Sequence, residues 1–424
     1  MNLDFVYGER NKVIIKLRKA VYLSLRVASR GAAIAKLKKR TDDRKISSVA
    51  LVLPDNGTPV DFGDALNRLA WFIGNKVPKK LPAVTVVGPE CLADVLPDIP
   101  PSQRNFMDRI ERYDFVSFSD VDLSRFDAVM LWRARSALNP RFWSGVDRWH
   151  IGDPDLYSGS DFGNGIRIAK NLSTKRPTKE IAALSKRNFE RLFDKYHDIG
   201  KSVVLGTGPS LSDLDLEKLK GRSVIACNAI VKNVSLLEKL KPAAICFADP
   251  VFHIGPSEYA ATFRDDLVRA VKQFGCFAVT LSDTVDLLLR HYPELETEII
   301  GVDVSNQWSI PTADNLVVRS TSNILTMLML PVAASLADDI WIGGCDGRKK
   351  EENYFWKHNS GAQYEGLMKD AFLTHPSFFR DRVYSDYYEE HCRLLEDQLT
   401  FYEQKKKKFQ TITPSFIPAL KMRQ

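Results

Sequence analysis

The amino-acid sequence predicts an α/β protein: a Rossmann-like, mainly parallel sheet with helices on both faces, preceded by a smaller α/β domain and a basic N-terminal helix. Short runs of Val, Ile and Leu alternate with amphipathic stretches, which is typical of parallel strands joined by crossover helices. A glycine-rich turn follows one of these runs at residues 206–210. Basic side chains are concentrated before residue 46.

The length of 424 residues predicts two or three domains. We divide the chain into a basic amphipathic helical segment at 1–45, a small α/β domain of unknown role at 46–175, a linking helix at 176–200 and a larger α/β domain at 201–424.

The first segment carries the positive charge of the chain. Residues 1–45 hold thirteen Lys and Arg against four acids, so they contribute +9 to a total of +7, and the remainder sums to −2. A body that is not basic argues against nucleic-acid binding. Apolar residues recur at helical spacing between the basic ones: Val13, Ile14, Leu17, Val21, Leu25 and Ala28. Residues 10–45 therefore form either a helix on an anionic membrane surface or a helix packed on a domain with a solvated charged face.

The small domain begins with a short α/β pattern. Its apolar runs predict strands at 49–53, 83–87, 115–118 and 128–131, with a helix at 62–73. Residues 153–165, rich in Gly, Asp and Ser, predict a loop, and 178–197 a charged amphipathic helix.

The larger domain continues the alternation. Strands are predicted at 202–206, 223–227, 243–247, 277–281, 297–301 and 339–343. Ligands of such sheets bind beyond the carboxyl ends of the strands, so we expect a site near residues 206–210 and 228.

The six cysteines are scattered and none forms a C-x-x-C pair, which predicts neither a disulfide framework nor a structural zinc site. No signal peptide is recognisable, and no apolar run is long enough to span a membrane. We expect a cytoplasmic protein, with the basic segment as a peripheral contact on the inner membrane face.

The turn at 206–210 is the most informative local feature. Val203, Val204 and Leu205 predict a buried strand, and Gly206 and Gly208 then allow a sharp turn and close approach to a ligand. Pro209 fixes φ, and Ser210 is placed to cap a helix that begins at Leu211. A strand, glycine turn and helix start form either a phosphate or nucleotide site or a plain tight turn. The sequence is neither G-x-G-x-x-G nor a P-loop.

A second polar cluster precedes an apolar helix. Ser320, Thr321 and Ser322 lie before residues 324–336, where their hydroxyls either cap the helix or donate to a phosphate.

In their order, these pieces resemble one family. The chain has G-x-G-P-S-L at 206–211, C-N at 227–228, A-D-P at 248–250, T-S at 321–322, G-G-x-D at 343–346 and a later Tyr- and His-containing segment. This series is similar to the bacterial sialyltransferases of glycosyltransferase family 42, over residues 200–415. The same core recurs in flagellin-glycosylating motility-associated proteins and in an archaeal-type 6-hydroxymethylpterin pyrophosphokinase.

The resemblance implies a set of donor-binding residues. Gly206, Thr207, Gly208, Pro209, Ser210, Asn228, Asp249, Thr321 and Ser322 would hold the cytidine monophosphate (CMP) part of the donor. The chain departs from the family at two of them: Thr207 replaces an Asn, and Asp249 replaces the Asn of an Asn-Pro pair. Asp249 brings a negative charge near a nucleotide, or else binds ribose hydroxyls.

The resemblance also implies catalytic residues. The leaving phosphate would be stabilised by Tyr354 and by Arg348, which stands where the family has a tyrosine. His375 matches the family's general base, with His358 and His391 as competitors.

The reaction implied is an inverting transfer of a sugar, such as sialic acid or a related nonulosonate, from a CMP-linked donor to a surface glycan, glycolipid or glycoprotein. No cofactor or metal is expected; the D-x-D strings at 120–122, 153–155 and 213–215 are common by chance in a chain with 53 acids. The sequence leaves the oligomeric state open, with a homo-oligomer as one alternative.

Three alternatives remain open. One is a pterin pyrophosphokinase-like enzyme that uses ATP and Mg²⁺, with Asp249 and Asp346 as metal ligands. Another is a non-catalytic nucleotide- or glycan-binding assembly protein. The third is a transferase whose cleft lies between two Rossmann-like halves, with residues 47–170 binding the acceptor.

Overall fold

The computed structural model describes residues 44–76, 80–155, 158–348, 360–380 and 384–424, together with residues 20 and 24. The predicted basic helix at 1–45 therefore lies almost wholly outside the described residues.

The first sheet has five parallel strands in the order β3-β2-β1-β4-β5. The strands are β1 (Ser48–Val52), β2 (Ala83–Gly88), β3 (Tyr113–Ser117), β4 (Ala128–Trp132) and β5 (Trp149–Gly152). The centre of the sheet is apolar because β1 and β4 are buried along almost their whole length.

The second sheet has eight parallel strands in the order β11-β10-β9-β8-β7-β6-β12-β13. The strands are β6 (Gly200–Leu205), β7 (Ser223–Cys227), β8 (Ala244–Cys246), β9 (Phe277–Leu281), β10 (Ile299–Ser305), β11 (Val317–Arg319), β12 (Ala337–Gly343) and β13 (Lys408–Thr411).

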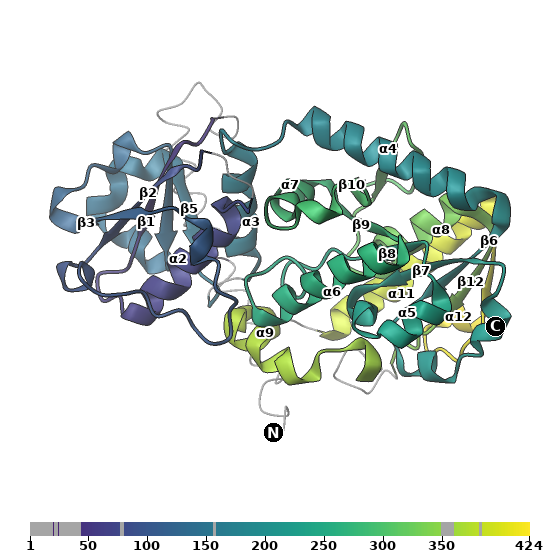
Figure 1. The fold of residues 1–424 in the computed structure, drawn as a ribbon. Helices are drawn as coiled ribbons and strands as arrows, with labels where there is room; N and C mark the ends of the chain where they lie inside the picture. Colours follow the sequence, from purple (N-terminus) through teal and green to yellow (C-terminus); the bar gives the residue numbers. More distant parts are fainter. Residues whose placement is uncertain are drawn as a thin grey trace.

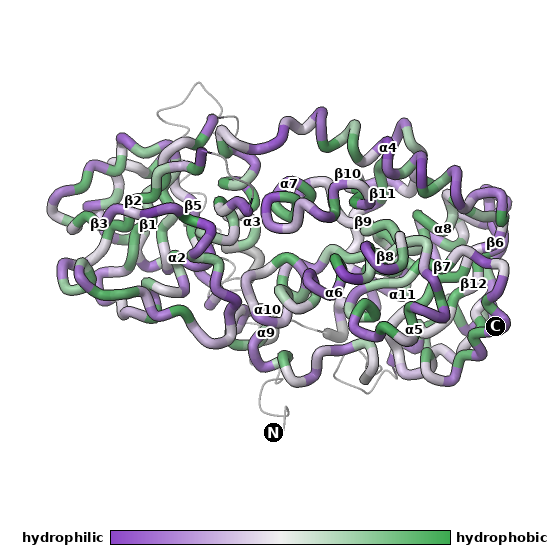
Figure 2. Tube along the Cα trace, in the orientation of Figure 1, coloured by the Kyte–Doolittle hydropathy of each residue, from purple (hydrophilic) through white to green (hydrophobic). Residues whose placement is uncertain are grey.

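Helices flank both sheets (Figure 1). They are α2 (Pro59–Ile73), α3 (Ser158–Asn171), α4 (Thr178–Tyr196), α5 (Val234–Leu240), α6 (Glu258–Phe274), α7 (Ser282–His291), α8 (Leu330–Leu336), α9 (Met368–Thr374), α10 (Pro376–Arg380), α11 (Tyr384–Gln404) and α12 (Pro418–Lys421). In Figure 2 the apolar segments gather along the strands, and hydrophilic residues recur along α4.

The predicted fold class is confirmed. Two parallel sheets flanked by helices form a Rossmann-like α/β fold, and every strand predicted from an apolar run is present within a few residues. Short or polar strands were not predicted: β5, β11 and β13.

The predicted loop at 153–165 was wrong over its second half, because α3 begins at Ser158. Glycines favour loops, but here Gly165 permits close helix packing: a Cβ at Gly165 would lie 2.3 Å from the Phe72 ring of α2. Close packing of α3 on α2 therefore explains a glycine inside a helix.

The two sheets are joined by a buried contact between α2 and the loop after β8. The indole Nε1 of Trp71 donates to the Ile254 carbonyl at 2.7 Å. The Arg264 guanidinium lies 4.1 Å from the centre of the Trp71 ring and donates to the carbonyls of His253 and Gly255. Both Trp71 and Arg264 are fully buried, so the contact is part of the core.

The structure places α4 on the second sheet. This helix, predicted as a link, packs against β10 and α8. No described helix is long and apolar enough to cross a membrane.

Candidate ligand pocket at the carboxyl edge of the second sheet

The order in which strands are added to the second sheet reverses between β6 and β12, while all the strands stay parallel. From β6 the chain adds β7 to β11 on one side, and it then returns to place β12 and β13 on the other side. In open parallel sheets the loops diverge at such a switch point and leave a crevice where ligands bind.

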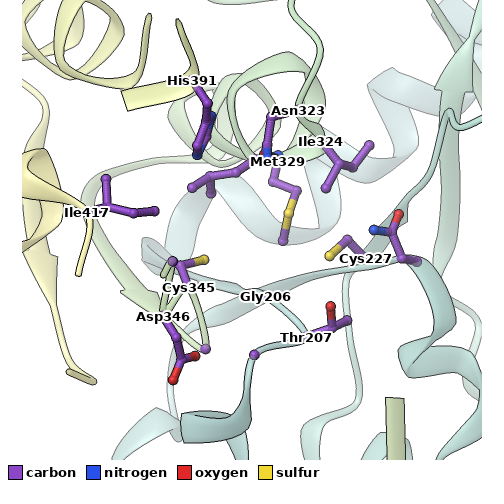
Figure 3. Close-up of a pocket in the computed structure, with 15 residues that line it drawn as sticks. Gly206, Thr207, Cys227, Asn323, Ile324, Met329, Cys345, Asp346, His391 and Ile417 are labelled. Atoms are coloured by element: carbon purple, nitrogen blue, oxygen red, sulfur yellow. Dashed lines mark hydrogen bonds between the residues drawn. The ribbon is translucent and has the colours of Figure 1, made fainter. Parts of the chain in front are cut away.

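A pocket with about 420 Å³ of space, counted to its open mouth, lies at this switch point. Its lining comes from the ends of β6, β7 and β12, from the segment before α8, from α11 and from the residue before α12: Gly206, Thr207, Gly208, Cys227, Asn228, Asn323, Ile324, Leu325, Met329, Gly344, Cys345, Asp346, Gly347, His391 and Ile417. In Figure 3, Met329, Cys345 and Cys227 surround the middle of the pocket, and His391 lies opposite Thr207 and Asp346.

The glycine turn is explained by close approach to the loop after β12. The amides of Gly206 and Gly208 donate to the carbonyls of Gly343 and Gly344 at 2.9 and 2.8 Å. A Cβ at Gly206 would lie 2.5 Å from the Gly344 oxygen, and a Cβ at Gly208 2.0 Å from Asp346 Oδ2. These two amides are therefore engaged within the protein, unlike the open phosphate cradle that the sequence suggested.

Ser210 has a different role from the predicted helix cap. The segment Pro209–Asp213 is a single 3-10 turn, and no α-helix begins at Leu211. The Ser210 amide and hydroxyl donate to the two carboxylate oxygens of Asp346 at 3.0 and 2.8 Å. The Asp346 carboxylate thus lies at this turn in the place where the sequence suggested a bound phosphate. Pro209 is exposed and is not part of the pocket lining.

Asn228 lies in the pocket in a conformation that is unusual for a residue with a side chain. Its φ is +52°, in the left-handed region, which costs about 1 kcal/mol for a non-glycine residue. Its side-chain oxygen Oδ1 is buried and has no hydrogen-bond partner in the described residues. A pocket-lining residue with a left-handed backbone and a buried, unsatisfied acceptor is a candidate ligand contact.

The polar cluster before α8 caps its helix through Asn323. Asn323 Oδ1 accepts a hydrogen bond from the Leu325 amide at 2.9 Å, at the start of a π-helical turn, Leu325–Met329. The Thr321 hydroxyl pairs with that of Thr326 at 2.8 Å, and the Ser322 carbonyl accepts from Tyr387. Thr321 and Ser322 lie beside the lining rather than in it, whereas Asn323 is part of it.

Asp249 is engaged in its own turn. Its Oδ1 accepts hydrogen bonds from the amides of Val251 and Phe252 at 2.8 and 3.0 Å. Asp249 is not among the residues that line the pocket.

The structure places Arg348 against α11. The side chain is buried, its guanidinium lies 4.7 Å from the centre of the Tyr388 ring, and its carbonyl accepts from the Tyr388 hydroxyl at 3.0 Å. Arg348 is not in the pocket lining. Tyr354 and His358 lie outside the described residues.

The two described histidine candidates differ in position. His375 is buried at the contact between the two sheets, where the Arg68 guanidinium donates to the neighbouring Thr374 carbonyl. Burial, and to a smaller degree Arg68, holds the pKa of His375 well below its ordinary value. His391 instead lines the pocket, and burial lowers its pKa to about 4. Both imidazoles are therefore neutral at pH 7.

The sequence reasoning missed part of the lining. Asn323, Met329, Cys345 and Ile417 were not predicted, and His391 was only a competitor to His375. One signal was present: the polar run at 343–346 follows an apolar strand, as the glycine turn does, so it too ends at the carboxyl edge.

The fold and the pocket define an α/β protein with a pocket at the switch point of a parallel sheet. No family model, curated protein or solved structure matches the chain. Each of the six cysteines, all within the described residues, is a free thiol. No group of three or more His, Cys, Asp or Glu within the described residues is arranged to hold a metal.

Proposed function

We propose that the protein transfers a sugar from a nucleotide-activated donor, a CMP-linked nonulosonate, to a hydroxyl of a glycan or glycoprotein, and that the switch-point pocket holds the nucleoside end of the donor. The observation that supports this most is the meeting of the glycine turn, Asn228 and the 343–346 loop around one pocket. The resemblance assigns the glycine turn and Asn228 to the donor site, although both are distant in the sequence from the 343–346 loop.

The chemistry of the lining favours a nucleoside over a bare phosphate. Ile324, Leu325, Met329 and Ile417 supply apolar surface that suits the faces of a base and a ribose. The buried Oδ1 of Asn228 can accept a hydrogen bond from an exocyclic amino group. The amides of Gly206 and Gly208 are engaged, so the donor phosphate lies outside the turn in this proposal.

Asp346 is the charged group of the pocket. Its carboxylate is fixed by two hydrogen bonds from Ser210, and the remaining lone pairs can accept from ribose hydroxyls. This role is the one that the sequence suggested for Asp249, whose carboxylate is used in its own turn.

The transfer step needs a group that accepts the proton of the acceptor hydroxyl. The acceptor oxygen bonds to the anomeric carbon as the bond from that carbon to the phosphate oxygen breaks, and the proton passes to a base. A neutral imidazole can take it, and His391 is the histidine in the pocket. We therefore place His391 beside His375 as a candidate base.

The ATP- and Mg²⁺-dependent alternative gains no specific support. It requires carboxylates that converge on the phosphates, whereas Asp346 is bonded to Ser210 and Asp249 to its own turn.

Titration calorimetry tests the binding step. CMP, UMP, GMP and ATP with Mg²⁺ are titrated into the full chain and into an Asn228→Gly variant, which removes the amide and relieves the left-handed strain. We expect CMP to bind more tightly than UMP, GMP or ATP with Mg²⁺. The affinity of the Asn228→Gly variant for CMP should be about tenfold lower because one hydrogen bond is lost.

The matched control is Lys241→Gly. Lys241 also has a positive φ, of +44°, and its position at the end of α5 is outside the pocket lining. Both variants should gain stability from strain relief, but only Asn228→Gly should lose CMP affinity. The absence of CMP binding, or equal affinity in both variants, would contradict the proposal.

A further inference from the structure

The 343–346 loop, which forms one wall of the switch-point pocket, is held from two sides. On one side it meets the glycine turn: amides of the turn donate to its carbonyls, and the Asp346 carboxylate accepts both hydrogen bonds of Ser210. On the other side it contacts residues 411–417, which run from the end of β13 to the start of α12. The contacts on this second side are not used by the function proposed above.

Thr413 fixes the loop at Gly344. The buried Gly344 amide donates to the hydroxyl oxygen of Thr413, which is itself buried, at 3.0 Å. Gly344 has a φ of +66°, in the left-handed region, which glycine enters about as readily as the ordinary one. Because glycine has little preference of its own, the hydrogen bond to Thr413 selects one conformation for this part of the loop.

Ser415 fixes the next two residues. Its hydroxyl donates to the Cys345 carbonyl at 2.8 Å, with the Asp346 carbonyl at 3.3 Å, and accepts from the Ile417 amide at 3.1 Å. The Phe416 amide donates to the same Asp346 carbonyl at 2.7 Å. The main chain of Asp346 is therefore held by residues 415 and 416, while its carboxylate is bonded at the glycine turn.

The two hydroxyls reach the pocket only through the loop and its neighbour Ile417. Thr413 and Ser415 are not among the residues that line the pocket, whereas Ile417 is. Ile417 packs on the residue that follows the loop, because a Cβ at Gly347 would lie 2.6 Å from Ile417 Cγ1. Gly347 also has a positive φ, of +69°. The loop thus lies between two left-handed glycines, and residues 413–417 supply the contacts that order it.

We propose that Thr413 and Ser415 are positioning residues for the donor site: they hold the 343–346 loop so that the Asp346 carboxylate stays at the glycine turn, where it meets the ribose. This inference rests on the proposed function, because it takes Asp346 to be a contact of the nucleoside. A loop with flexible glycines that is ordered before the ligand arrives binds it more tightly than a loop that the ligand must order.

The first experiment compares Thr413→Val with Thr411→Val. Valine nearly keeps the shape of threonine but removes the hydroxyl, so Thr413→Val leaves the Gly344 amide without its acceptor. The Thr411 hydroxyl is buried and has no partner in the described residues, so Thr411→Val removes no hydrogen bond. By calorimetry on the full chain, we expect the Kd of CMP to rise about tenfold in Thr413→Val and to stay unchanged in Thr411→Val.

A rescue variant and a second pair separate positioning from stability. Thr413→Ser keeps the hydroxyl and should restore the wild-type Kd of CMP. Ser415→Ala should raise the Kd about tenfold. Ser335→Ala is its control: the Ser335 hydroxyl also donates to two carbonyls, those of Pro311 and Pro331, but lies outside the pocket lining. If these hydroxyls served stability alone, both serine variants would lower Tm and neither would change the Kd.

Hydrogen exchange gives a readout that needs no nucleotide. Three amides of the glycine turn at 206–210 donate to the 343–346 loop. In Thr413→Val these amides should exchange about tenfold faster than in Thr411→Val, because the loop that accepts their bonds is no longer fixed. The amides of β1 and β4, in the first sheet, should keep their exchange rates.

Either of two results would overturn the inference. One is equal exchange of the turn amides in Thr413→Val and Thr411→Val, and the other is an unchanged Kd of CMP in both Thr413→Val and Ser415→Ala. Absence of CMP binding by the wild type contradicts the proposed function instead. Faster exchange of the turn amides in Thr413→Val would then still support the positioning of the loop, so the two failures are distinguishable.

Discussion

Replacing Gly208 by alanine tests the interpretation that the glycine turn is shaped by its contact with the loop after β12. The added Cβ would lie 2.0 Å from Asp346 Oδ2 and 2.8 Å from the Gly344 oxygen. The carboxylate would have to withdraw by about 1.4 Å to reach the ordinary contact distance of 3.4 Å. Such a shift breaks the 2.8 Å bond from the Ser210 hydroxyl.

The cost follows from these contacts. Overpacking a tight site costs about 1–3 kcal/mol, and the loss of a hydrogen bond to a charged acceptor about 1.5–3 kcal/mol. We therefore expect Gly208→Ala to lower the free energy of unfolding by about 4 kcal/mol and Tm by about 8 °C. A Cβ added at Gly163 in α3 would meet no atom within 4 Å, so Gly163→Ala should be neutral or raise stability by about 0.5–1 kcal/mol.

Scanning calorimetry on both variants gives the comparison, and a double-mutant cycle isolates the cause. In an Asp346→Ala background the carboxylate is absent, so Gly208→Ala should cost about 2 kcal/mol less than in the wild type. Additive costs in the cycle, or equal Tm values for Gly208→Ala and Gly163→Ala, would refute this reasoning.

Two further predictions concern the histidines. In a transfer assay with a CMP-linked sugar, His391→Gln should reduce turnover about a hundredfold and His375→Gln less than about tenfold, since only His391 lines the pocket; the reverse order would return the base role to His375. The pKa of His391 falls to about 4 on burial, so the neutral form is favoured in the folded state: this stability is present above about pH 6.5 and is lost as the pH falls towards 4, by about 1.4 kcal/mol per pH unit. Urea unfolding of His391→Gln should accordingly show a shallower loss of stability between pH 6 and 4 than the wild type, and parallel curves would contradict it.

The fold could be predicted from the sequence where strands are apolar and central. β1, β4, β7 and the second half of β6 are almost continuous apolar runs because helices cover both faces of their sheets. β13, with the sequence Lys-Phe-Gln-Thr, lies at a sheet edge and needs no such run. The helix α3 was missed because its glycines are typical of loops; the packing on α2 that explains Gly165 is visible only in the structure.

The site was predictable only in part. The end of a strand locates the carboxyl edge, so Gly206, Gly208 and Asn228 could be expected to lie together. Which side chains complete the pocket depends on the strand order: β12 lies beside β6, and this brings Asp346 to the turn. The strand before Asp346 places this residue at the carboxyl edge but not beside β6, and nothing in the sequence around Ile417 or His391 indicates that they lie near the turn.

The strand order also constrains how the chain folds as it is synthesised. β7, the first partner of β6, is the next strand to be made, but the other edge of β6 stays open until four more strands, β8 to β11, have been made and β12 arrives. Until then the backbone groups of β6, and the amides of Gly206 and Gly208, lack their final acceptors, and an open edge of this kind invites pairing with other chains. Ile417, which also lines the pocket, is synthesised later still. The crevice is thus among the last parts of the second sheet to form, and a nascent chain that stalls before residue 337 presents an aggregation-prone edge.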